Sequence, residues 1–109
     1  MNYNFIKKIM IGTAQFGSEY GVSNKKKISK NQIKKIFYFL EKKKIQKFDT
    51  AENYGDAELK IGTYNKIKKF TISTKISSLK KVKQKDLEQK INSKVEDMCK
   101  KLNTNKINY

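Results

Sequence analysis

Short apolar runs alternate with amphipathic helical patterns along this chain, and this alternation limits the folds open to it more than any other feature. Three runs have the length and composition of strands, at residues 8–17, 45–50 and 70–76. A helical pattern follows each run, and residues 106–109 resemble the opening of a fourth strand. Strand and helix in alternation predict an α/β fold with a parallel sheet whose crossover connections are helices.

The first long helix has a sequence signal for its start and one apolar face. Ser29 precedes Gln32 by three residues, which is the spacing of a capping box. Apolar residues then recur at intervals of three and four, as on one face of a helix. They are Ile33, Ile36, Phe37 and Leu40.

Two further helices are predicted from local signals. Asp56 is expected to cap a short helix that runs to about Tyr64, and Gly62 is expected either to pack closely or to end that helix. The last helix is expected to begin near Asp86 and to carry a second apolar stripe. Its members are Leu87, Ile91, Val95, Met98 and Leu102.

The basic composition says little about a partner. The chain has 26 basic and 10 acidic residues, a net charge of +16 that normally indicates a polyanion partner. Every basic residue is lysine, however, whereas bidentate recognition of phosphate relies on arginine. The chain also lacks proline and tryptophan and is rich in asparagine and isoleucine, residues that AT-rich codons favour. We therefore expect a solvated lysine surface and no specific nucleic-acid partner.

The chain has the features expected of a cytoplasmic protein. Its one cysteine, Cys99, cannot form an internal disulfide, which fits a reducing compartment. No apolar run reaches the length of a signal-peptide core or of a membrane span. We therefore expect no association with a membrane.

The ends of the predicted strands carry a candidate proton donor. In parallel α/β folds, the loops at the carboxyl ends of the strands converge on one crevice. A tyrosine phenol has a pKa of about 10 and becomes a useful acid near neutral pH when a neighbouring cation stabilises its phenolate. Lys75 would supply that cation to Tyr54, and Asp49 would hold the lysine in place. The three residues are thus a candidate donor of a proton to a carbonyl oxygen.

These segments resemble the N-terminal part of aldo-keto reductases. The resemblance lies in GTAQFGSEYGVSN at 12–24, in DTAENYGDAELKIG at 49–62 and in the lysine of STKI at Lys75, which follow one another in the family's order and spacing. It implies a (β/α)8 TIM barrel that binds NADPH and passes hydride to an aldehyde or ketone.

The resemblance also assigns roles to particular residues. It makes Tyr54 the general acid and Lys75 the residue that lowers the pKa of Tyr54. Asp49 pairs with Lys75 and lies near the nicotinamide ribose. Gly12 and Thr13 match first-strand positions that approach the cofactor. The hydride chemistry would belong to the cofactor, while the protein supplies position and electrostatics.

The chain is short for the implied barrel. Such a barrel has about 250 residues, and the 109 residues here supply about three βα units plus the start of a fourth strand. The family's catalytic histidine has no counterpart, because the chain contains no histidine. We therefore expect residues 1–109 to be a truncated N-terminal part of a reductase barrel domain, inactive by itself and able to pair with a complementary barrel fragment.

Alternatives stay open at this point. One alternative is a non-catalytic remnant acting as a basic binding or scaffolding module. A module that binds nucleic acid would need lysines clustered on one face with aromatic residues between them, whereas the lysines are scattered over every segment. A metal-dependent barrel enzyme is disfavoured, because no histidine and no cysteine cluster are present to bind a metal.

Gly17 and Gly21 are expected to adopt positive φ in a loop. Glu52 is expected to shape its loop, and Glu58 either packs or faces the cofactor site.

Overall fold

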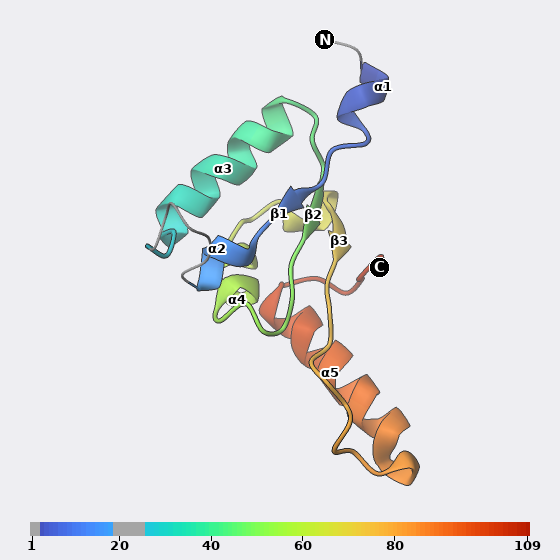
Figure 1. The fold of residues 1–109 in the computed structure, drawn as a ribbon. Helices are drawn as coiled ribbons and strands as arrows, with labels where there is room; N and C mark the ends of the chain where they lie inside the picture. The colour runs from blue at the N-terminus through green and yellow to red at the C-terminus, as the bar shows by residue number, and fades with distance from the viewer. Residues whose placement is uncertain (1–2, 19–25) are drawn as a thin grey trace.

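A three-stranded parallel sheet forms the centre of the protein (Figure 1). The computed structural model describes residues 3–18 and 26–109. The strands are β1 (Ile11–Gly12), β2 (Lys47–Asp49) and β3 (Thr71–Ser73), and they lie side by side in that order. The α/β fold with a parallel sheet, predicted from the alternating pattern, is confirmed.

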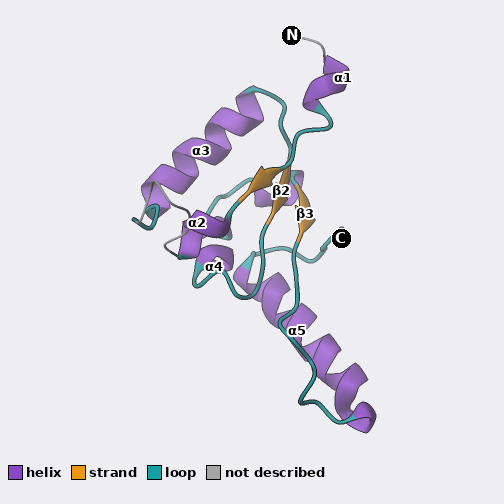
Figure 2. Cartoon of the chain, in the orientation of Figure 1, coloured by secondary structure: helices purple, strands orange, loops and turns teal. Residues whose placement is uncertain are grey.

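Helices connect the strands and flank the sheet (Figure 2). The long helix α3 (Lys30–Lys42) lies between β1 and β2 in the chain, and α4 (Ala57–Ile61) lies between β2 and β3. The helix α5 (Leu87–Lys101) follows β3. The short helical segments are α1 (Tyr3–Ile6) and α2 (Ala14–Gly17), with 3-10 turns at Ile67–Lys69 and Gln84–Asp86. Each strand is therefore followed by a helix, as in successive βα units.

The predicted capping box at the start of α3 is present. The backbone N–H of Gln32 donates to Ser29 Oγ at 3.3 Å, and the Ser29 N–H donates to Gln32 Oε1 at 2.9 Å. The apolar face that follows is turned to the core: Ile33, Phe37 and Leu40 are buried, and Ile36 is partly buried.

Phe37 is at the centre of an aromatic cluster that joins α3 to the sheet. Its ring centroid lies 5.0 Å from that of Phe70, 5.4 Å from that of Phe48 and 5.5 Å from that of Tyr64. The Tyr64 hydroxyl donates to Glu41 Oε2 at 2.7 Å. Burial and this bond raise the pKa of Tyr64 to about 12. The cluster therefore holds the helix against β2 and against the start of β3.

The strands are shorter than the sequence predicted. The run at 8–17 forms a strand only at Ile11–Gly12, because Phe16 N–H bonds to the Thr13 carbonyl at 2.9 Å and closes a helical turn that buries the Phe16 ring. Likewise, the runs at 45–50 and 70–76 are strands only in their middle residues. Gly21, which was expected to adopt positive φ in a loop, lies outside the described residues.

The predicted cap of α4 is wrong, and the helix is shorter than expected. Asp56 occupies the N-cap position but makes no capping bond, because its carboxylate pairs instead with Lys60 at 3.2 Å. The helix ends at Ile61 rather than near Tyr64. Gly62 fulfils both expectations: it is the C-cap residue, and a Cβ there would overlap the carbonyl oxygen of Lys101.

The apolar stripe of α5 is only partly used. Met98 and Leu102, at the end of the stripe beside α4, are buried, whereas Val95 is 38% exposed. The N-terminal turns of α5 extend away from the sheet (Figure 1), so the sheet does not cover this part of the helix. The pattern therefore predicted the helix correctly but not the depth to which each residue is buried.

Residues 106–109 are not a strand, yet they hydrogen-bond along β3. The Tyr109 N–H donates to the Ile72 carbonyl at 3.1 Å, and the Thr74 N–H donates to the Tyr109 carbonyl at 3.0 Å. These two bonds enclose Ser73 in the way that a parallel neighbour would. The prediction of a fourth strand is therefore wrong, because residues 106–109 form no strand. The segment nevertheless lies beside β3, where a neighbouring strand would lie.

The outer face of α3 is basic and solvated. Its lysines off the apolar face are exposed, and Tyr38 and Phe39 among them are 55% and 56% exposed. The ammonium groups of Lys42 and Lys43 lie 5.3 Å and 5.7 Å from the centroids of those two rings. Within residues 3–18 and 26–109, no helix has the length and apolar composition needed to cross a membrane.

Replacing Phe37 by alanine should remove the centre of the aromatic cluster. We expect Phe37→Ala to lower the free energy of unfolding by about 3–5 kcal/mol, because it leaves a cavity between α3 and the sheet. Urea titration followed by circular dichroism measures this loss. Phe39→Ala on the same helix is the matched control and should change stability by less than about 0.5 kcal/mol. Similar losses for the two variants would contradict the packing described here.

Candidate functional site

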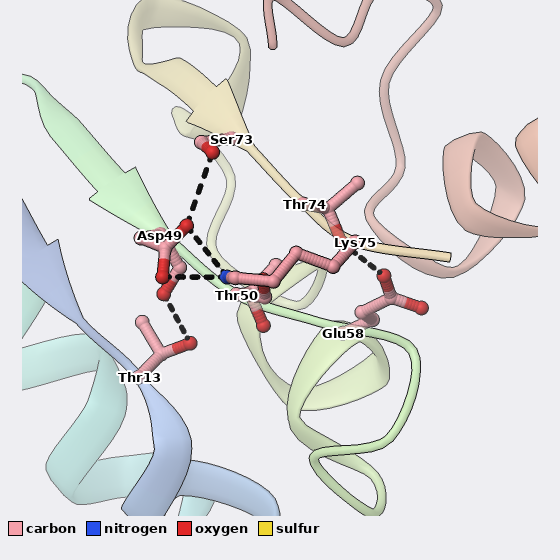
Figure 3. Close-up of polar contacts among 7 residues, drawn as sticks. All are labelled: Thr13, Asp49, Thr50, Glu58, Ser73, Thr74 and Lys75. Carbon is pink, nitrogen blue, oxygen red and sulfur yellow. Dashed lines mark hydrogen bonds and ion pairs between the residues drawn. The ribbon is translucent and has the colours of Figure 1, made fainter. Parts of the chain in front are cut away.

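The three strands end in one row of polar residues. The parallel register aligns Gly12 with Asp49 and Asp49 with Ser73. The chain continues from these residues into Thr13, into Thr50 and into the Thr74–Lys75 segment, which Figure 3 shows together at the carboxyl edge of the sheet. The candidate site expected at the strand ends is therefore a real cluster in space.

Asp49 and Lys75 form a tight ion pair. The ammonium nitrogen of Lys75 lies 2.7 Å and 2.8 Å from the two carboxylate oxygens of Asp49, and it also donates to the Thr50 carbonyl at 2.9 Å (Figure 3). The Ser73 hydroxyl donates to Asp49 Oδ1 at 3.0 Å. The side chains stay accessible, at 51% for Lys75 and 30% for Asp49. The lysine is thus fixed in direction while its charge remains near the surface of the site.

Tyr54 lies in the loop after β2, with its ring near Lys75. The Lys75 ammonium nitrogen is 5.5 Å from the centroid of the Tyr54 ring, within the range of a cation–π interaction. The Tyr54 N–H donates to the Ala51 carbonyl, and the Tyr54 carbonyl accepts from the Ala57 N–H, each at 3.1 Å. The structure therefore brings together all three residues of the predicted catalytic set.

Two glycines allow the Tyr54 loop to pack closely against α2. Gly55 has φ +56°, the left-handed conformation that favours glycine. A Cβ at Gly17 would overlap the Tyr54 carbonyl oxygen, and one at Gly55 would overlap the Gly17 carbonyl oxygen. The expectation that Gly17 serves through positive φ is wrong, because Gly55 alone has it among the glycines described. Gly17 instead allows close approach of two backbones.

The two predicted cofactor residues on the first strand differ in exposure. Thr13 is 1% exposed, and its N–H and its hydroxyl both donate to the Asp49 carbonyl, at 3.0 Å and 2.9 Å. Gly12 is exposed, and a Cβ built on it would meet no atom within 4 Å. The end of β1 therefore offers a free surface at Gly12, while Thr13 fixes the end of β2.

A second ion pair joins Glu52 of the same loop to Lys94. Lys94, on α5, donates to Glu52 Oε1 at 2.6 Å and to the Ser77 hydroxyl at 2.9 Å. The Ser77 N–H donates to Glu52 Oε2 at 2.8 Å. The Lys94 hydrogen bond, followed by that of Ser77, lowers the pKa of Glu52 from 4.5 to about 2. Sequence reasoning missed Lys94, because nothing in its helical pattern separates it from the other lysines of α5.

Glu58 is a buried acid beside the site. It is 3% exposed, and its Oε1 accepts a hydrogen bond from the Thr74 hydroxyl at 3.0 Å (Figure 3). Burial raises the pKa of Glu58. The preferred expectation that Glu58 packs in the interior is consistent with this burial. Among the described residues, no group of three histidine, cysteine, aspartate or glutamate side chains is placed to hold a metal ion.

The lowered pKa of Glu52 predicts a loss of stability in acid. Because its folded-state pKa lies below its ordinary value, the stabilisation is complete above about pH 4.5 and is lost as the pH falls towards 2. Glu52→Gln should be less stable than the wild type at about pH 6, and this difference should shrink by about 2 kcal/mol at about pH 2. Urea titrations at both pH values measure it. Glu88→Gln, at an exposed residue of α5, should follow the wild type; a parallel shift in both variants would contradict the assignment.

Comparisons with known proteins give the family of this chain. The model of the aldo/keto reductase family matches residues 8–109. A search of curated proteins gave no match. A crystal structure of a Pseudomonas aeruginosa protein named as an aldo-keto reductase is similar, with a TM-score of 0.68 and 24% sequence identity over 90% of this chain and 39% of that one.

The three βα units are similar to part of a larger solved structure. The chain spans about two fifths of the length of the matched structure, so its sheet corresponds to part of an aldo-keto reductase TIM barrel. The family match extends from Lys8 to Tyr109, which is nearly the whole chain. The protein therefore belongs to the aldo/keto reductase family.

Proposed function

We propose that Asp49, Tyr54 and Lys75 are the catalytic residues of an NADPH-dependent reductase of aldehydes or ketones. The observation that carries this proposal is the position of the Lys75 ammonium nitrogen. It lies 2.7 Å from Asp49 Oδ2 and 5.5 Å from the centroid of the Tyr54 ring. A lysine ammonium that is paired with a carboxylate and lies close to a tyrosine ring fits the chemistry of a tyrosine acid.

The proposed reaction uses the three side chains in distinct roles. Tyr54 donates its phenolic proton to the carbonyl oxygen as that oxygen gains negative charge. Lys75 stabilises the phenolate that remains, and Asp49 keeps Lys75 charged and directed. NADPH, when bound, supplies the hydride that reaches the carbonyl carbon.

The end of β1 fits the nicotinamide end of such a cofactor. Gly12 has open space where a side chain would otherwise stand, and the neighbouring Asp49 carboxylate is 30% exposed. We assign both residues to contact with the cofactor. Thr13 is buried and bonded to the Asp49 carbonyl, so its proposed contribution is to hold the strand ends in register. This fit involves only residues at the edge of the sheet.

The proposal treats residues 1–109 as the N-terminal part of a barrel domain. The chain has no histidine to orient a carbonyl substrate, and the similar structure extends well beyond the matched region. The partners we propose are a small carbonyl substrate and a polypeptide that supplies the rest of the barrel. We also propose a cytoplasmic setting, because the one cysteine of the chain, Cys99, cannot form an internal disulfide.

Substitution of the proposed acid should abolish reduction in a complete barrel. Residues 1–109 would be co-expressed with a polypeptide that supplies the remaining strands of an aldo-keto reductase, and NADPH oxidation would be followed with an aldehyde. We expect Tyr54→Phe to lower kcat by about 10²–10⁴-fold, because the proton donor is lost. Tyr38→Phe, at an exposed tyrosine on α3, is the control and should leave kcat unchanged. Full activity in Tyr54→Phe would refute the assigned role.

The isolated chain should not turn over substrate. We expect residues 1–109 alone to give no NADPH-dependent reduction above background, because the loops after strands seven and eight that hold cofactor phosphates in such barrels are missing. The same spectrophotometric assay, at matched protein concentration with and without the complementary polypeptide, measures this. Turnover by the isolated chain comparable to that of the assembly would overturn the expectation.

A further inference from the structure

Lys94 connects α5 to the two segments that carry the proposed catalytic residues. Its ammonium nitrogen lies 2.6 Å from Glu52 Oε1, in the loop of Tyr54, and 2.9 Å from Ser77 Oγ, in the segment after Lys75. The Lys94 and Glu52 side chains are only 16% and 21% exposed. The contact is thus better shielded from water than the pair of Asp49 and Lys75, which are 30% and 51% exposed.

Glu52 holds the backbone on both sides of Ile76. Its N–H donates to the Lys75 carbonyl at 3.0 Å, and its carboxylate oxygen Oε2 accepts from the Ser77 N–H at 2.8 Å. These two bonds fasten the segment that carries Lys75 to the loop that carries Tyr54. We call Glu52, Ser77 and Lys94 the clamp. The clamp therefore contacts a proposed catalytic residue, Lys75, through its backbone carbonyl.

The charge of Lys94 is what allows the carboxylate of Glu52 to serve in the clamp. A shielded carboxylate that lacks a cationic partner is costly, and it would turn towards water or take up a proton. Either response would weaken the bond from the Ser77 N–H. The position of Lys75 relative to Tyr54 therefore depends on a lysine of α5.

We propose that Lys94 is a positioning residue of the reductase site, acting through Glu52 to hold Lys75 against Tyr54. This inference rests on the proposed function of Asp49, Tyr54 and Lys75. It adds a residue that takes no direct part in the proton transfer. The N-terminal turns of α5 extend away from the sheet. Through Lys94, α5 would nevertheless support the proposed site at the carboxyl edge of the sheet.

Amide hydrogen exchange of the 109-residue chain, read by NMR, tests the clamp without any need for activity. We expect Lys94→Met to accelerate exchange of the Glu52 and Ser77 amides by about 10–100-fold. The amides of α3 should keep their rates. Lys90→Met, at an exposed lysine one turn earlier on α5, is the matched control and should change neither set. Lys94→Arg, which keeps the charge, should restore most of the protection.

A second readout reports the catalytic side chains directly. The methylene protons of Lys75 next to its ammonium group lie near the Tyr54 ring, and their NMR shift should move towards that of an exposed lysine in Lys94→Met. In the assembled reductase, the same variant should lower kcat by about tenfold with little change in KM. If the assembly is inactive with the wild-type chain as well as with the variants, the proposed function is refuted. The exchange and shift data would still decide the position of Lys75.

The outcomes that overturn the inference are distinct. Equal acceleration of all amides in Lys94→Met would mean a general loss of stability and no positioning role. Unchanged Glu52 and Ser77 amides, or an unchanged Lys75 shift, would mean that the clamp does not depend on Lys94. If Lys94→Met does not fold, Ser77→Ala removes one contact of Lys94 and keeps the charges. It should then accelerate the Glu52 amide by about 3–10-fold, and an unchanged rate would refute the proposal.

Discussion

The parallel register of the three strands places Gly12, Asp49 and Ser73 in one row, and the contacts of the candidate site depend on that row. Parallel strands are covered on both faces and leave little room for polar side chains along their length. Polar groups therefore gather where the strands end. Thr13 reinforces the row with two hydrogen bonds to the Asp49 carbonyl. A shift of one residue in this register would turn the Asp49 side chain away from Lys75, and the ion pair between them would be lost.

The two ion pairs of the site contribute in different ways. Asp49 and Lys75 are accessible to solvent, so their pairing adds little to stability, and its value lies in the direction it gives to the ammonium group. Glu52 and Lys94 are more shielded, and their pairing lowers the pKa of Glu52 to about 2. The accessible pair can therefore serve chemistry, while the shielded pair maintains the shape of the loops around it.

Local signals predicted much of this protein, and tertiary contacts account for what they missed. The Ser29 capping box and the approach of Lys75 to Asp49 were both readable, because the first is a pattern within four residues and the second follows from strand order. The cap at Asp56 failed because Lys60 competes for its carboxylate. Lys94 had no distinguishing signal, since its role depends on Glu52, a residue 42 positions away. The closely packed Gly17 was likewise recognisable only once its neighbours were known.

In the proposed reductase, the residues that donate the proton are separate from those that recognise the substrate. The proposed proton donor uses only β2, β3 and the loop between β2 and α4, and α5 supports it through Lys94. All of these elements lie within the described part of the chain, and they bring Asp49, Tyr54 and Lys75 close together. Groups that recognise the cofactor phosphates and the carbonyl substrate have to come from elsewhere in such a barrel. In a barrel with this division, later loops can vary without altering the contacts of the proposed proton donor.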